Sequence, residues 1–157
     1  MALTRDQIIT DYPLPAYNYR VDIGADTIAF SEVSGLEITH DTITYSESQS
    51  AAGRAGPNVM IMPAAKKPLT ITLKKGYVKT KSIGALYNWI ASIQLNRVDK
   101  KDITVHLCDE KGDSVVRWKV IDAFPTKLTA PSFSATSTEA AIESMELMAS
   151  SLEISEG

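Results

Sequence analysis

Apolar and polar residues alternate along the first part of the chain. Between residues 17 and 23 every second position is apolar, and these positions hold Tyr17, Tyr19, Val21 and Ile23. A period of two is typical of a strand that buries one face. A turn at residues 24–26 and an apolar segment at 27–35 predict that the chain pairs back as a hairpin, and residues 36–48 alternate again as a third, long strand.

Three later segments carry the same strand pattern. Residues 69–76 begin with three alternating apolar residues, Leu69, Ile71 and Leu73. Residues 103–108 and 114–121 alternate in the same way on the two sides of a polar turn at 109–113, which predicts a second hairpin. The pattern as a whole therefore predicts a mainly β protein.

One segment has the spacing of a helix. Around residues 82–95 the apolar residues recur every three or four positions and form one stripe, composed of Ile83, Leu86, Tyr87, Ile90 and Ile93. A stripe of this kind is typical of a helix that packs one face against a core. Ser82 can cap the start of this helix, and Trp89 and Trp118 are expected to anchor the core.

Two segments fit neither pattern. Residues 1–15 combine a polar stretch with Pro13 and Pro15, which cannot join a regular ladder, so they predict an N-terminal arm. Residues 46–68 are rich in Gly, Pro and small polar residues, which predicts an extended loop. The apolar run at 59–62 is too hydrophobic for a loop that hangs freely in water, and long loops in compact domains are usually functional or disordered.

The last part of the chain is ambiguous. A strand that starts near Trp118 meets Pro125 and then Pro131, which predicts that it is interrupted there. The composition of residues 137–154 favours a helix, with apolar residues near helical spacing. The apolar residues at positions 145, 147 and 149 also have the period of a strand, so the pattern alone leaves both structures open.

Composition and charge narrow the range of functions. The 157 residues fit a single domain, and their 44% hydrophobic content is that of an ordinary globular protein. The net charge of −3 gives no electrostatic reason to expect binding to nucleic acid or to an anionic membrane. No apolar run approaches the roughly 20 residues needed to span a bilayer, and the N-terminus has no apolar signal core. We therefore expect synthesis in the bacterial cytoplasm without a signal peptide, and no membrane anchor.

The sequence offers little reactive chemistry. His40 and His106 lie in strand patterns without further ligands at metal-binding spacing. Cys108, the sole cysteine, cannot form an intramolecular disulfide, and it follows His106 by two positions without a motif or a third group that would mark a nucleophile pair. The Gly-rich residues 53–58 lack the spacing of a phosphate-binding loop. We expect no catalytic, cofactor-binding or metal-binding residues, no cofactor and no enzymatic activity.

Five stretches of the chain, in the same order, resemble the tail tube family of contractile phages, which includes the inner tube proteins of extracellular contractile injection systems. These stretches are YPLPAYNYRVDIG, FSEVSGLEITHDTITY, ITLKKG, LYNWIASIQLNRVDKKDITVHLCDEKG and the C-terminal part that begins with WKVIDAFPTKLTAPSF. The most specific parts are VSGL, the L-x-x-W-I pattern of the helix, and AFPTKLTAPSF. The resemblance covers almost the whole chain.

This resemblance implies a fold and a structural function. Members of the family have two packed antiparallel sheets with one flanking helix, and the segment equivalent to residues 135–154 is a long strand. The break at Pro125 then becomes a corner between the sheets. Six subunits form a ring around a lumen that can hold protein cargo, and the rings stack into a tube inside a contractile sheath. The implied partners are further copies of the chain, sheath proteins, and baseplate and spike proteins of a phage-tail-like, extracellular particle.

The resemblance is weakest at residues 46–68, which look like an insertion. In the family this region reaches toward the adjacent ring, so the expected interface residues are Gln49, Arg54, Asn58, Met60, Ile61, Met62 and Pro63. The altered segment leaves open whether the chain builds the tube shaft or is a baseplate-proximal tube initiator that joins tube and spike. An alternative of another class is a monomeric β-barrel module that holds a small ligand.

Overall fold

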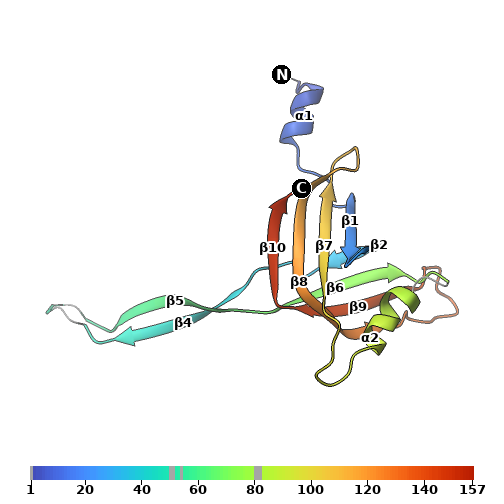
Figure 1. The fold of residues 1–157 in the computed structure, drawn as a ribbon. Helices are drawn as coiled ribbons and strands as arrows, with labels where there is room; N and C mark the ends of the chain where they lie inside the picture. Colours follow the sequence, from blue (N-terminus) through green and yellow to red (C-terminus); the bar gives the residue numbers. More distant parts are fainter. Residues whose placement is uncertain (1, 50–51, 54, 80–82) are drawn as a thin grey trace.

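A long, curved strand, β8 (Ser114–Thr129), organises the fold because it belongs to two antiparallel sheets (Figure 1). The computed structural model describes residues 2–49, 52–53, 55–79 and 83–157. Up to Ala123, β8 pairs with β7 (Lys101–Cys108), and from Phe124 onward it pairs with β9 (Ile142–Ala149). The change of partner follows Asp122, whose φ of 55° bends the chain.

Pro125 was expected to interrupt this strand, but the strand continues through it. The register of β8 against β9 is irregular between Pro125 and Lys127. Proline is tolerated in a sheet at such an irregularity or at an edge, because the ladder needs no N–H there. The expected corner between the sheets is therefore present, and it is made by bending one strand of 16 residues instead of breaking it.

The first sheet contains β2 (Asp26–Ile28), β1 (Tyr19–Ile23), β7, β8 and β10 (Ser151–Glu156) in that order. The alternation predicted between residues 17 and 23 is present on β1, where Val21 and Ile23 are buried. Tyr17 lies before the strand and is exposed. The predicted hairpin around residues 109–113 is formed by β7 and β8.

The second sheet contains β3 (Glu32–Ser34), β6 (Leu69–Gly76), β9 and the end of β8. Residues 27–35 were expected to form one strand that pairs back as a hairpin; the hairpin is confirmed, but the single strand is wrong. The chain pairs with β1 only as β2 and then leaves to pair with β6 as β3. Gly35 follows with a φ of 88°, a conformation that a residue with a side chain rarely adopts, and it packs against Thr70.

The C-terminal segment is extended and contains no helix in the structure. Met145, Leu147 and Ala149 alternate on β9 and are buried, so the strand that the family resemblance implies is confirmed and the helix is wrong. The segment crosses from the second sheet to the first at Ser150. There the backbone N–H and the side-chain hydroxyl of Ser150 donate to the carbonyl oxygen of Ile121 at 3.1 and 3.0 Å, which fixes the corner.

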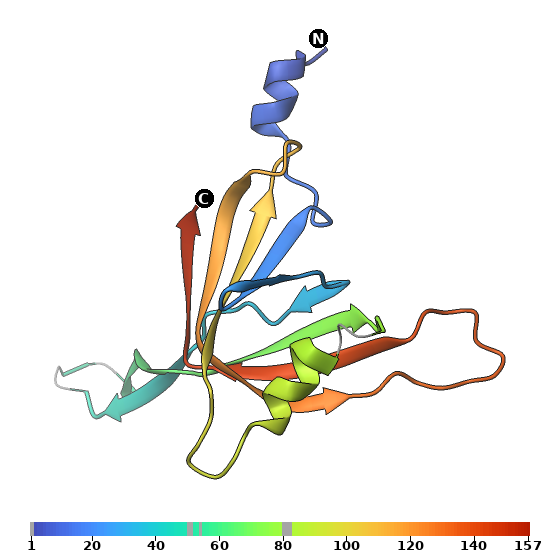
Figure 2. The same ribbon diagram turned by 45° about the vertical axis from the view of Figure 1, so that its right-hand side comes forward.

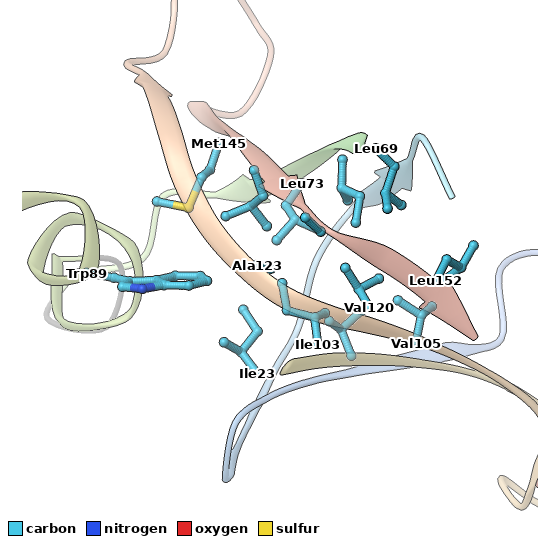
Figure 3. Packing of buried hydrophobic residues seen from close by; sticks show 14 of the residues in the cluster. Ile23, Leu69, Leu73, Trp89, Ile103, Val105, Val120, Ala123, Met145 and Leu152 are labelled. Carbon is cyan, nitrogen blue, oxygen red and sulfur yellow. The ribbon is translucent and has the colours of Figure 1, made fainter. Parts of the chain in front are cut away.

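The hydrophobic core lies inside the angle between the two sheets (Figure 3). It is formed by inward residues of six strands, β1, β6, β7, β8, β9 and β10, together with Leu86 and Trp89 from the helical segment. The indole of Trp89 donates to the carbonyl oxygen of Asp99 at 2.8 Å, so its polar atom is satisfied within the core. Trp89 is the anchor that the sequence predicts, whereas Trp118 is only partly buried.

The helical segment is shorter than the expected residues 82–95. It consists of a π-helical turn, η1 (Ile83–Tyr87), and one α-helical turn, α2 (Asn88–Ala91), and Ser82 lies outside the described residues. The wider π-helical turn shifts the apolar stripe. Leu86 is buried, but Tyr87 is 54% exposed.

The expected loop at residues 46–68 is wrong for residues 46–47 and 58–66, which belong to strands. β4 (His40–Glu47) and β5 (Asn58–Lys66) form an antiparallel hairpin that projects away from the two sheets (Figure 1). The strand expected at residues 36–48 accordingly begins only at His40. The Gly and Pro residues that predicted a loop are concentrated in the connection at 48–57, while β-branched and Met residues occupy the strand.

The N-terminal arm expected at residues 1–15 contains a short helix, α1 (Arg5–Asp11). Thr4 and Gln7 form a capping box that satisfies backbone N–H groups at its start. The helix stands beyond the tips of the first sheet and has no buried residue (Figure 2). Its apolar residues therefore face solvent in the single subunit.

Candidate interaction surfaces

The hairpin of β4 and β5 has one strongly apolar face. The register pairs Ile43 with Met62 and Tyr45 with Met60, so these four side chains lie together on one side of the ribbon. All four are exposed. Exposed apolar patches of this kind mark surfaces that contact another protein.

The opposite face of the hairpin carries both polar and apolar side chains. Thr42 pairs with Pro63 and Thr44 with Ile61, which places hydroxyl groups beside apolar side chains. Ile61 is 72% exposed, the largest value on the hairpin among the large apolar residues. A two-stranded ribbon with exposed apolar groups on both faces has little stability of its own in water. The hairpin therefore has the properties of an element that is covered by a partner.

The two ends of the hairpin are tied to each other at its root. The backbone N–H of Lys67 donates to the carbonyl oxygen of Thr39 at 2.8 Å. The Lys67 ammonium also lies 2.9 Å from the carboxylate of Asp41. Because β5 leads into β6 within two residues, the hairpin extends the sheet beyond the body of the subunit.

Most of the interface residues expected from the sequence come together on this hairpin. Five of them occupy one strand, β5, and these are Asn58, Met60, Ile61, Met62 and Pro63. Gln49 lies in the connection and is partly buried, and Arg54 lies outside the described residues. The expected set missed Ile43 and Tyr45, although the alternation of residues 36–45 contains the signal that places them opposite the Met residues.

The sheets also present outer strands without a neighbour on one side. β2 and β10 are the outer strands of the first sheet, and β3 is the outer strand of the second. Residues 124–129 of β8 pair with β9 on one side, and within the described residues no strand pairs with the other side. Unpaired edges of this kind are hazards in a monomer and templates for pairing in an assembly.

A hollow of about 530 Å³ opens between the first sheet and the N-terminal segment. Its walls are mostly apolar and include Leu14, Tyr19, Leu36, Leu107 and Trp118. The hollow lies on the same side of the first sheet as the core, and Glu32 and Val33 of β3 also line it. Its size and walls suit a small apolar ligand, and they also suit an apolar side of another subunit.

The histidine and the cysteine that share a strand do not form a reactive pair. The Nε2 atom of His106 lies 2.8 Å from a carboxylate oxygen of Asp22, and its Nδ1 atom lies 3.0 Å from the hydroxyl of Ser114. The buried thiol of Cys108 donates to the carbonyl oxygen of His106 at 3.8 Å. Both ring nitrogens are engaged by other groups, so the cluster joins β1, β7 and β8.

The carboxyl of Asp22 is electrostatically stabilised in this cluster. Burial alone would raise its pKa, but hydrogen bonds with Thr27 and His106 and the nearby positive charge of His106 and Arg20 outweigh burial, so the pKa lies below its ordinary value. In the part of the chain that the structure describes, no three His, Cys, Asp or Glu side chains converge as they do at a metal site. None of the described helices is long and apolar enough to cross a membrane.

The comparisons with known proteins agree on one family. The family model of the T4-like virus tail tube protein gp19 matches residues 15–153. The chain is 40% identical, with a TM-score of 0.87, to a chain in the cryo-EM structure of the PVC sheath-tube complex, an extracellular contractile injection system in its extended state. That match covers 99% of this chain and 100% of the other. A comparison with curated proteins gives no match.

Two further structures extend the comparison. A chain in the cryo-EM structure of the anti-feeding prophage cap, a tube-terminating cap, is 43% identical with a TM-score of 0.83, and the match covers 100% of both chains. A chain in the anti-feeding prophage baseplate is 14% identical with a TM-score of 0.70, covering 92% of this chain and 97% of its own length. At that identity the baseplate likeness concerns the fold alone.

Proposed function

The chain belongs to the T4-like virus tail tube protein family, and from this premise we propose that it assembles into hexameric rings that stack into the inner tube of a contractile injection system. It is a structural tube protein. The observation that carries the proposal is the near full-length likeness to a chain of a sheath-tube complex, combined with an apolar hairpin whose large side chains are exposed among the described residues.

Ring formation follows from the open edges of the second sheet. Residues 124–129 of β8 are free on one side of this sheet, and β3 with the adjoining hairpin is free on the other. Pairing of one edge with the opposite edge of the next copy joins the sheets head to tail. Such a heterologous contact closes by rotation, and the closed barrel leaves no free edge around its lumen.

The hairpin is the contact between successive rings in this proposal. Asn58, Met60, Ile61, Met62 and Pro63 lie on β5, which reaches beyond the body of the subunit (Figure 1). Gln49 follows β4 in the connection between the two strands, and Arg54, which lies outside the described residues, stays a residue expected from the sequence. Contact with a neighbouring ring removes the apolar faces from water, which is favourable in proportion to the buried area.

The position of the chain within the particle is the tube shaft in this proposal. The sequence is far more similar to the chains of the sheath-tube and cap structures than to the baseplate chain. For a tube initiator we would instead expect greater sequence similarity to the chain in the baseplate structure. Negative-stain electron microscopy separates the two positions, since a shaft protein extends into long tubes and an initiator stops at one or two rings.

The remaining partners follow from the same assignment. Sheath proteins surround the tube, and baseplate and spike proteins lie at one end of an extracellular phage-tail-like particle. The lumen offers space for protein cargo. The chain acts without enzymatic activity, and its contribution is to form the rigid conduit.

Light scattering of the purified protein tests the proposal. Rings require a mass that is a multiple of the 17.1 kDa chain, with six copies for one ring. A species that stays at the mass of a single chain at high concentration would overturn the proposal. It would favour the monomeric ligand-binding module, with the apolar hollow beside Trp118 as its site.

A further inference from the structure

A second pocket, separate from the hairpin and the sheet edges, lies at the end of the second sheet beside the helical segment. It has a volume of about 350 Å³. The end of β8, the residues that follow it, and the exposed Tyr77 and Tyr87 form its walls, which include Leu128 and Pro131. Glu143, near the start of β9, is the one charged residue among the described residues that line it.

One oxygen of the Glu143 carboxylate is buried without a partner among the described residues. The residue is 5% exposed, and its Oε1 atom has no hydrogen-bond partner among the described residues. A buried carboxylate without a hydrogen bond is costly, and an unsatisfied group of this kind requires a structural explanation. Glu143 and the core residue Met145 are two positions apart on β9, so both side chains lie on the inward face of the strand. The side chain of Glu143 therefore cannot turn to the opposite face.

The nearest cation along the ladder forms no ion pair with this carboxylate. Lys75 is the register partner of Glu143 on β6, and it is also buried. The ion pairs of the described residues engage Lys67, Lys74, His106 and Lys119, so Lys75 and Glu143 are not joined. The pocket therefore keeps an unpaired acceptor at its base.

The chemistry of the walls selects the class of ligand. A charged acceptor pairs most strongly with a charged donor, and tyrosine rings attract a cation placed over their faces. One carboxylate between apolar walls cannot supply the six or more oxygen ligands that Ca²⁺ takes. A single orphan oxygen matches the point charge of an ammonium group, whereas a guanidinium forks onto two oxygens. The apolar walls also suit the aliphatic stem of a lysine.

We propose that this pocket receives the side chain of a lysine from a second copy of the chain, with the ammonium group on Glu143 and the stem between Tyr77 and Tyr87. The source is another copy because, among the described Lys and Arg residues, ion pairs within one subunit engage only Lys67, Lys74 and Lys119. The surface of each copy thus offers unpaired lysines. This inference rests on the proposed assembly into rings and tubes.

The substitution Glu143→Gln gives two effects of opposite sign. Below the concentration at which subunits assemble, the variant should unfold at a temperature a few degrees higher, because it removes an unpaired buried charge. Its critical concentration for assembly should rise about tenfold or more, because a charge-assisted hydrogen bond is lost. Glu110→Gln, in the exposed turn between β7 and β8, removes the same charge and should change neither quantity. A Glu143→Gln variant that loses stability, or that assembles normally, would overturn the proposal.

A side-chain-resolution cryo-EM map of the assembled wild-type protein identifies the occupant. The expected result is a lysine of a neighbouring copy with its Nζ atom at hydrogen-bond distance from Glu143. An empty pocket, or one occupied by Lys75 of the same chain or by a different protein, would refute it. If the protein does not assemble, the proposed function fails separately. In that case N-acetyl-lysine methylamide should still bind the wild-type monomer and not Glu143→Gln, and equal binding to both would refute the site.

Discussion

Replacing Ile61 by Asp tests the hairpin as an assembly element. Ile61 lies on β5 opposite Thr44 and is 72% exposed in the single subunit. The substitution should therefore leave the subunit folded, with a change in its free energy of unfolding within about 0.5 kcal/mol, as for exposed positions in general. Assembly should instead be blocked, because the new carboxylate would lie in the contact between rings.

The size of the effect on assembly follows from the exposed fraction of the Ile61 side chain. Burying a whole Ile side chain contributes about 1.5–3 kcal/mol, so covering the 72% of Ile61 that is exposed contributes about 1–2 kcal/mol for each copy. Asp at this position loses the free energy gained by burying Ile61, and it adds a desolvation penalty of several kcal/mol for each buried ion. Because every subunit of a ring carries the change, the penalties act together at each ring contact.

The assay combines a thermal melt of the subunit with electron microscopy of the assembly. The expected result is an unchanged unfolding midpoint, together with rings or subunits that do not extend into tubes. Leu95→Asp is the matched control, since Leu95 is also an exposed apolar residue and lies outside the hairpin. Tubes of normal length from Ile61→Asp would refute the role of the hairpin, and a strongly lowered midpoint would mean that the residue supports the subunit fold instead.

Three further predictions concern the subunit itself. Gly35→Ala should lower the unfolding midpoint by several degrees in a circular dichroism melt, because its φ of 88° is strained for Ala and a Cβ would overlap the carbonyl oxygen of Thr70; an unchanged midpoint would contradict this packing. Asp22→Asn should destabilise the protein at neutral pH and flatten its acid unfolding curve. The folded-state pKa of Asp22 is depressed, so its contribution is present above the ordinary value of about 4 and is lost as pH falls through the folded-state value; parallel wild-type and variant curves would refute it. Thr4→Ala should cost about 1 kcal/mol of local helix stability, seen as faster amide exchange in α1, while the unfolding midpoint stays constant because α1 buries no residue.

The strands that bury one face were predictable from the sequence because their period is local. β1, β6 and the hairpin of β7 and β8 follow the alternation of apolar residues directly. The C-terminal strands were different, because their composition favours helix and only pairing with β6 and β8 makes them extended. There the family resemblance supplied the information that local propensity lacks.

The misjudged elements depend on contacts that local patterns do not encode. The hairpin was obscured by Gly53, Gly56 and Pro57 in its connection and by Pro63 within β5, although the apolar run at 59–62 indicated a buried contact. The division of residues 27–35 between two sheets depends on the close packing of Gly35 against Thr70. The unpaired carboxylate of Glu143 could not be found from sequence, since it depends on which face of β9 meets the helical segment.

The most direct test of the central claim is electron microscopy of the purified full-length protein viewed end-on and side-on. The account predicts rings with sixfold symmetry and a central lumen, stacked into tubes, with the hairpin of β4 and β5 crossing from one ring to the next. A protein that remains a single 17.1 kDa chain, or closed assemblies whose hairpins point into solvent, would contradict it.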